Sequence, residues 1–192
     1  MQSHDIPSLL LLLCVPVFCL HGQTDSLVLV WQRELSAGIA NRSSQFSGAT
    51  TDAAGNVFAV GSTETAQNES DLLIVKYSPL GEEIWETTYD GPLHQGDGAG
   101  WVFPNPDGGV TVLGTSVTRQ GGWPPDILVV RLAPDGSRIW ARSFPPPADT
   151  LARSILEAQV DQAQALYVLA EENDYPYSWN GRQVTQGPSD RA

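Results

Sequence analysis

The residues best suited to chemistry lie in one short loop, DGPLHQGDG, which carries Asp90, His94 and Asp97. A histidine near carboxylates can act as a general base, and grouped carboxylates can bind calcium. The loop lacks the alternating Asp/Asn ladder of a calcium-binding loop, so a calcium site at Asp90 and Asp97 is the weaker interpretation. We expect His94 to be a solvated loop histidine rather than a catalytic base.

Other signatures of catalysis are missing from the sequence after residue 22. His94 is the sole histidine there and no cysteine remains, so neither a His-rich zinc site nor a Cys–His pair can form. The Gly-x-Ser-x-Gly motif is absent, and no glycine-rich phosphate loop precedes a helix pattern. We therefore predict no enzyme activity and no catalytic, cofactor-binding or metal-binding residues in this chain.

Composition narrows the class of protein. The 192 residues are 41% hydrophobic and 17% charged, a balance that supports a folded core. The net charge is −12, from 22 acidic and 10 basic residues, and such a surface repels phosphate backbones. Nucleic acid is therefore not an expected partner.

The N-terminus differs from the rest of the chain. IPSLLLLLCVPVFCL (6–20) is almost wholly apolar and contains both cysteines, Cys14 and Cys19. Its length suits a signal peptide over residues 1–22 better than a membrane span. A retained anchor is the alternative, and a lipoprotein is disfavoured. Export without disulfides indicates a secreted or bacterial envelope protein, although sequons at Asn41 and Asn68 point weakly towards eukaryotic secretion.

A repeat of about 55 residues organises the remainder. DLLIVKYSPLGEEIW (71–85) returns as DILVVRLAPDGSRIW (126–140), and Trp31, Trp85 and Trp140 are spaced 54 and 55 apart. A period of this length is typical of stacked supersecondary units. Short apolar runs bounded by Gly, Pro, Asp and Asn predict four strands in each unit, A to D, without sustained helical periodicity. The expected ranges are 44–51, 98–105 and 153–160 for A, 56–62, 109–115 and 165–171 for B, 71–78 and 126–133 for C, and 27–35, 83–89 and 138–144 for D.

The connections between these strands alternate between short and long. DAAGN, NPDGG, SPLGE and APDGS, between A and B or between C and D, have the proline and glycine placement of tight turns. The B–C and D–A connections are longer and irregular. The B–C loops become longer and more aromatic along the chain, up to the third, predicted over 172–189.

The pattern GNVFAVGST, a loop, DLLIVKYSPLGEEIW and then TTYDG resembles the bacterial seven-bladed-propeller (SBBP) repeat over residues 27–171. The resemblance implies an all-β fold, a partial β-propeller of four-stranded antiparallel blades. Residues 23–192 would form the repeat region, with an N-terminal D strand, two full blades and an incomplete third blade. Propellers close with about four to eight blades, so we expect the chain to be a fragment that self-associates or needs missing blades.

The spacing Gly-x-x-x-Trp, at Gly81 to Trp85 and Gly136 to Trp140, is similar to the tryptophan-docking motif of quinoprotein propellers. The resemblance implies that a tryptophan packs between neighbouring blades. Trp31, Trp85 and Trp140 would be the blade tryptophans, buried at equivalent positions, and Asp71 and Asp126 would mark strand entry.

These features predict an exported binding or structural scaffold that binds an extracellular protein or a carbohydrate. The alternative is part of a quinoprotein-like or hydrolytic propeller enzyme whose catalytic residues lie outside this chain. Exposed aromatic and arginine side chains favour partner binding, whereas local capping of the loops is the structural alternative. The candidate partner-binding residues are in the long loops: Arg119, Trp123, Tyr175, Tyr177, Trp179 and Arg182.

Overall fold

The computed structural model describes residues 9–17, 26–35, 43–65, 69–120, 124–145, 152–174 and 178–184. Over these residues the protein is all-β, with antiparallel sheets and no helix. No helix long and apolar enough to cross a membrane occurs in these ranges. The predicted all-β class and repeated four-stranded antiparallel units are therefore confirmed.

The first and second sheets repeat the same meander. The first sheet contains β3 (Ser44–Thr51), β4 (Val57–Glu64), β5 (Ser70–Tyr77) and β6 (Glu83–Tyr89), paired in that order. The second contains β7 (Asp97–Pro104), β8 (Val110–Ser116), β9 (Asp126–Leu132) and β10 (Arg138–Phe144). These are the predicted strands A to D. The second A strand begins one residue earlier than expected, which makes Asp97 its first residue.

The third sheet corrects one prediction. It contains β11 (Ala152–Val160), β12 (Leu166–Asp174) and β13 (Ser178–Val184), in that order. The sequence predicts a long loop over residues 172–189, but β13 lies within that range and pairs antiparallel with β12. Pairing satisfies backbone groups along β12 that would otherwise be left at a sheet edge, although the sequence of β13 carries no strong strand signal.

The N-terminal strands form a separate two-stranded sheet. β1 (Leu9–Val17) pairs antiparallel with β2 (Ser26–Leu35), the predicted lone D strand. The apolar N-terminal segment is therefore a strand in the full chain. The signal peptide at 1–22 stays a prediction.

The first strand of each of these three sheets carries a β-bulge at the same place. The register shifts between Phe46 and Gly48 in β3, between Ala99 and Trp101 in β7, and between Ile155 and Glu157 in β11. The residues opposite are small: Gly61, Gly114 and Ala170. A Cβ on Gly61 or Gly114 would lie about 2 Å from a facing carbonyl oxygen, at 1.8 and 1.9 Å respectively, so glycine permits this close approach.

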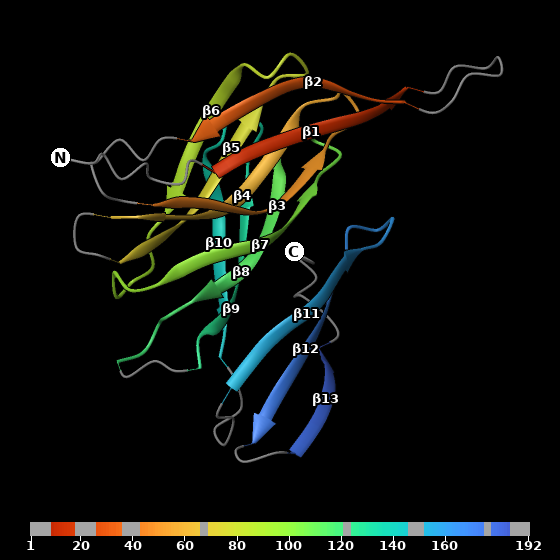
Figure 1. Ribbon diagram of the computed structural model, residues 1–192. Coiled ribbons are helices and arrows are strands. Elements are labelled where there is room, and N and C mark those ends of the chain that lie inside the picture. The colour runs from red at the N-terminus through yellow and green to blue at the C-terminus, as the bar shows by residue number, and fades with distance from the viewer. Residues whose placement is uncertain are drawn as a thin grey trace.

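The core lies between sheets as well as within them. One cluster joins Phe58, Val60 and Ile74 of the first sheet to Val112 and Val130 of the second. Another joins the second sheet to the third, so the second sheet lies between its neighbours (Figure 1). Residues Leu72–Tyr77 are all buried, as expected for a strand covered on both faces.

Candidate functional site

The connections place two kinds of surface at opposite ends of the strands. The short-turn end is made of turns 52–56, 78–82, 105–109, 133–137 and 161–165. The long-loop end is made of the described parts of the connections that follow β4, β6, β8 and β10. Because antiparallel strands alternate in direction, all A–B and C–D turns fall at one end and all B–C and D–A loops at the other.

The short turns are closed by their own residues. The Asp52 carboxylate accepts the backbone N–H groups of Ala54 and Asn56, both at 2.9 Å. Gly55, with φ of +82°, occupies the left-handed region that the turn requires. The hydrogen-bonding groups of this turn are therefore largely used within the turn and are not available to a ligand.

The C–D turns also receive a tryptophan from the preceding sheet. Trp31 of β2 donates its indole N–H to the carbonyl of Pro79 at 3.1 Å, and Trp85 of β6 donates in the same way to Pro134 at 3.0 Å. A Cβ on Gly81 would lie 2.6 Å from the Trp31 ring, and one on Gly136 would lie 2.8 Å from the Trp85 ring. Each docking site therefore needs glycine for two reasons, space and a positive φ.

The three blade tryptophans differ in burial. Trp31 is buried, as predicted, but Trp85 and Trp140 are only half-buried. β6 and β10 are edge strands of their sheets, so a neighbouring strand of the same sheet pairs with only one side of each. Trp140 packs against the cluster between the second and third sheets, and the Arg142 guanidinium lies 5.2 Å from its ring centroid.

At the long-loop end, three carboxylates lie close together where the first and second sheets meet. Asp71 lies near the start of β5, Asp90 directly follows β6, and Asp97 begins β7 of the second sheet. One oxygen of each carboxylate lies within 4.8 Å of the others. Asp97 is only 2% exposed. Three acidic groups from two sheets therefore share one small volume.

The electrostatics of this cluster follow from burial and like charge. Burial raises the pKa of Asp97, and the charge of Asp90 adds to this rise. The Ser116 hydroxyl lies close by and partly offsets the rise, although it makes no hydrogen bond of good geometry with Oδ1. Burial and the charges of Asp90 and Asp97 raise the pKa of Asp71. Negative charge is thus disfavoured here unless a cation accompanies it.

His94 lies on the solvent side of this cluster. Its side chain is 79% exposed, and its Nδ1 is 2.5 Å from Asp90 Oδ2. The hydrogen bond and the charge of Asp90 raise the pKa of His94. The expectation of a solvent-exposed loop histidine is confirmed.

The corresponding carboxylate in the second sheet, Asp126, has different partners. Asp126, 55 residues after Asp71, is 3% exposed and accepts the Thr118 hydroxyl at 2.5 Å. Arg119 Nη2 lies 3.5 Å from the other carboxylate oxygen and donates to the Pro124 carbonyl at 3.0 Å. Arg119 is an exposed loop residue, as predicted, and it also holds its own loop in place.

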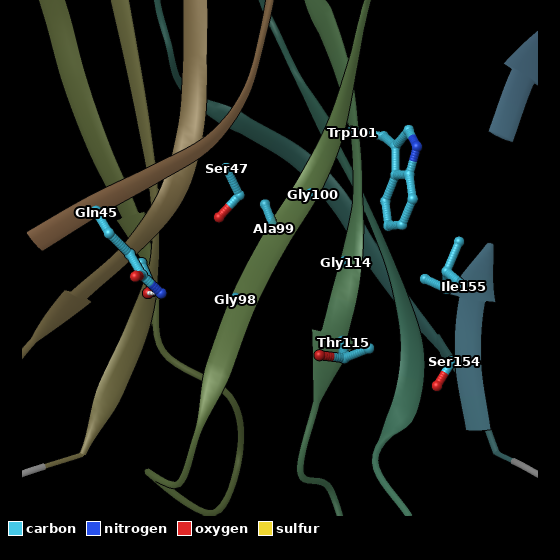
Figure 2. A pocket seen from close by; sticks show the side chains of 11 residues that line it. Gln45, Ser47, Gly98, Ala99, Gly100, Trp101, Gly114, Thr115, Ser154 and Ile155 are labelled. Carbon is cyan, nitrogen blue, oxygen red and sulfur yellow. Dashed lines mark hydrogen bonds between the residues drawn. The ribbon is translucent and has the colours of Figure 1, made fainter. Parts of the chain in front are cut away.

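A hollow of about 330 Å³ lies beside the three bulged strands β3, β7 and β11. Figure 2 shows Gln45 and Ser47 on one side, Gly98 and Gly100 in the middle, and Trp101 and Ser154 on the other. No charged residue lines it. Hydroxyl, amide and indole groups suit an uncharged polar ligand.

The other predicted partner-binding residues fall into two groups. Trp123, Tyr175 and Tyr177 lie outside the described residues. Trp179 and Arg182 lie in β13 and pair with Asn173 and Ala170 of β12, so they belong to a strand rather than to the predicted loop. Their role in partner binding stays a prediction.

Asp90 and Asp97 share one short loop in the sequence, whereas Asp71 lies in a different segment. Asp71 is 26 residues from Asp97, and only the pairing of β5 with β6 and the packing of β7 against β5 brings them together. The sequence feature that points to Asp71 is its repetition at Asp126, since both aspartates stand at the start of a C strand.

Comparison with known proteins adds no assignment: no protein-family model matches the chain, and no curated protein matches it. The resemblance to the SBBP repeat therefore stays a prediction.

Proposed function

We propose that this chain is part of an exported β-propeller that serves as a binding or structural scaffold in the bacterial envelope or outside the cell. One observation carries the proposal: each of two successive tryptophans docks on the C–D turn of the next sheet through the same hydrogen bond, to Pro79 and to Pro134. A contact that repeats from sheet to sheet gives each pair of neighbouring sheets the same relative orientation. Radial stacking in a propeller requires such a constant orientation.

The free face of the third sheet supports further stacking. Tyr167 and Leu169 are 44% and 40% exposed on β12, whereas Val168 and Ala170, which alternate with them, are buried against the second sheet. The first and second sheets have Val60 and Leu113 where the third has Leu169, and both are fully buried by the following sheet. The exposed face fits another sheet of the same kind.

The long-loop end is the proposed recognition surface. Binding residues usually lie on loops that a rigid scaffold positions. The short-turn end offers less, since two of its turns already hold tryptophans and Asp52 caps another. The proposed partner is an extracellular protein or a carbohydrate, for which the uncharged hollow beside Trp101 offers a second contact region.

Self-association tests the stacking part of this proposal. We expect Leu169→Lys to lower the sedimentation-derived mass of the full chain, because a charge on the free face opposes apolar packing. Leu80→Lys is the matched control, since Leu80 is 75% exposed on a short turn. Equal association of both variants and the parent would argue against stacking through this face.

Binding is tested by screening the full chain on glycan and envelope-protein arrays. A ligand found there should be lost when Trp123, Tyr177 and Trp179 are changed together to Ala, and kept by Leu80→Ala. Unchanged binding by the triple variant, with loss in Leu80→Ala, would place recognition at the short-turn end instead.

A further inference from the structure

Three carboxylates lie together where the first and second sheets meet, and their grouping does not help the two sheets to pack. Asp71, Asp90 and Asp97 each supply an oxygen to a volume in which all three oxygens lie within 4.8 Å of one another. They come from β5, from the residue after β6 and from β7, so two sheets contribute. Three like charges at this spacing repel one another and oppose the packing of the two sheets.

Two buried oxygens at this place lack partners. Asp97 Oδ2 accepts the Gly91 backbone N–H at 2.6 Å, but Oδ1 has no hydrogen-bond partner. Ser116 is completely buried, and its Oγ also has none. A Cβ on Gly91 would lie 2.8 Å from Ser116 Oγ and 2.9 Å from Asp97 Oδ1, so both oxygens border the same space. Buried polar atoms without partners are costly, and a cation bound beside these two oxygens would satisfy both.

In the second sheet, a positively charged side chain of the chain itself lies beside the corresponding carboxylate. Buried Asp126 has the Arg119 guanidinium at 3.5 Å and the Thr118 hydroxyl at 2.5 Å. Arg119 is five residues after Gly114, and the first unit has Ala66 five residues after the equivalent Gly61. Arg153 takes the strand position of Asp97, since it pairs with Glu172 as Asp97 pairs with Ser116. The acidic trio is therefore particular to one junction.

We propose that Asp71, Asp90 and Asp97, together with the Ser116 hydroxyl, bind a divalent cation with the preference of calcium and so join the first and second sheets. The donors are all oxygens, which hard cations favour. Calcium holds oxygens at about 2.3–2.6 Å, so its ligands lie up to about 5 Å apart, and the observed spacing fits within that limit. Magnesium holds its oxygens at about 2.0–2.1 Å and demands a stricter octahedral geometry, so a set of mixed, partly exposed carboxylates suits it less well.

Position and exposure assign distinct roles to the ligands. Asp97 and Ser116 are fixed in the interior and would set the depth of the ion, whereas Asp90 is exposed and lies at the entrance. Asp90 is also the residue that His94 contacts, so the loop 90–97 would close over the ion. The bound cation would replace repulsion between the sheets with attraction to both.

The experiment titrates the full chain, stripped with chelator, with Ca²⁺ alone at constant ionic strength, by thermal unfolding and by calorimetry. We expect saturable binding in the range of extracellular calcium modules, about 10⁻⁴–10⁻³ M, and a rise in Tm of a few degrees at saturation. Mg²⁺ should produce a smaller shift. Asp71→Asn and Asp97→Asn should each weaken calcium binding about tenfold or more, because each removes one ligand charge.

Two further variants make the outcome decisive. Ser116→Ala should weaken binding without removing charge, and Asp126→Asn, the matched change in the second sheet, should leave calcium binding unaltered. If Asp97→Asn fails to fold, partly exposed Asp71→Asn still tests the site. No saturable calcium binding by the parent chain, or equal binding by Asp71→Asn and Asp126→Asn, would overturn the proposal. Stabilisation of the parent by acid with no response to calcium would show that the carboxylates share protons instead, and would also overturn it.

Discussion

The short-turn end and the long-loop end of the sheets differ in how far equivalent residues of the repeat make the same contacts. At the short-turn end, the turns of the first and second sheets make the same contact: Trp31 docks on the Pro79 turn as Trp85 docks on the Pro134 turn. At the long-loop end, the same strand positions diverge, and Asp71 belongs to an acidic cluster whereas Asp126 pairs with Arg119. Repetition therefore marks the contacts that hold sheets together, and divergence marks the surface that is free to acquire specificity.

The largest effect is expected at the short-turn end, for Trp85→Ala. The change removes a half-buried ring that packs on Gly136 and Phe58, and also the hydrogen bond to Pro134. We expect a loss of about 3 kcal/mol in the free energy of unfolding, measured by urea denaturation. Trp85→Phe keeps most of the ring and should lose about 1 kcal/mol. If Trp85→Ala is as stable as the parent chain, the tryptophan contacts at the short-turn end do not hold the sheets together.

A smaller loss is expected for Gly136→Ala. Its φ is +84°, and the new Cβ would lie 2.8 Å from the Trp85 ring. Backbone strain and displacement of the ring together predict a loss of about 2 kcal/mol. The matched control is Gly100→Ala, because a Cβ there meets no atom within 4 Å. Comparable losses in both variants would mean that chain stiffness, and not docking, governs the difference.

At the long-loop end, Arg119→Ala should cost about 1 kcal/mol, because it leaves the buried Asp126 carboxylate with fewer partners. The side chain of Arg119 is 45% exposed, so solvent screens much of the attraction. Asp126→Asn in the Arg119→Ala background should recover part of the loss. A double-mutant cycle by thermal unfolding measures this coupling, and zero coupling would show that the two residues act independently.

The smallest expected effect is on the loss of stability at low pH, to which Asp107 in a short turn contributes. The backbone N–H of Gly109, together with Arg131, lowers the pKa of Asp107. A lowered pKa means stability that is present above the unfolded value of about 3.9 and is lost as pH falls through the folded value. Asp107→Asn should therefore flatten the decline in stability below about pH 4. A curve parallel to that of the parent chain would contradict this contribution.

Local sequence signals predicted most of the repeated framework. The bounds of 44–51, 83–89 and 138–144 agree with β3, β6 and β10, since Gly, Pro, Asp and Asn end each apolar run at a turn. The resemblance to the docking motif also implied inter-sheet packing of the tryptophans. It did not indicate that Gly81 holds Trp31 and that Gly136 holds Trp85, because each pair is about 50 residues apart.

The sequence alone determined the class of fold, the number of strands in each full repeat and the placement of the turns, because these depend on residues adjacent in the chain. Tertiary structure decided the rest. It added β13 by edge pairing, left Trp85 and Trp140 half-exposed on outer strands, and brought Asp71 to Asp97 across a sheet junction. These outcomes depend on which strands become neighbours, and the packing of apolar faces sets that choice over long sequence separations.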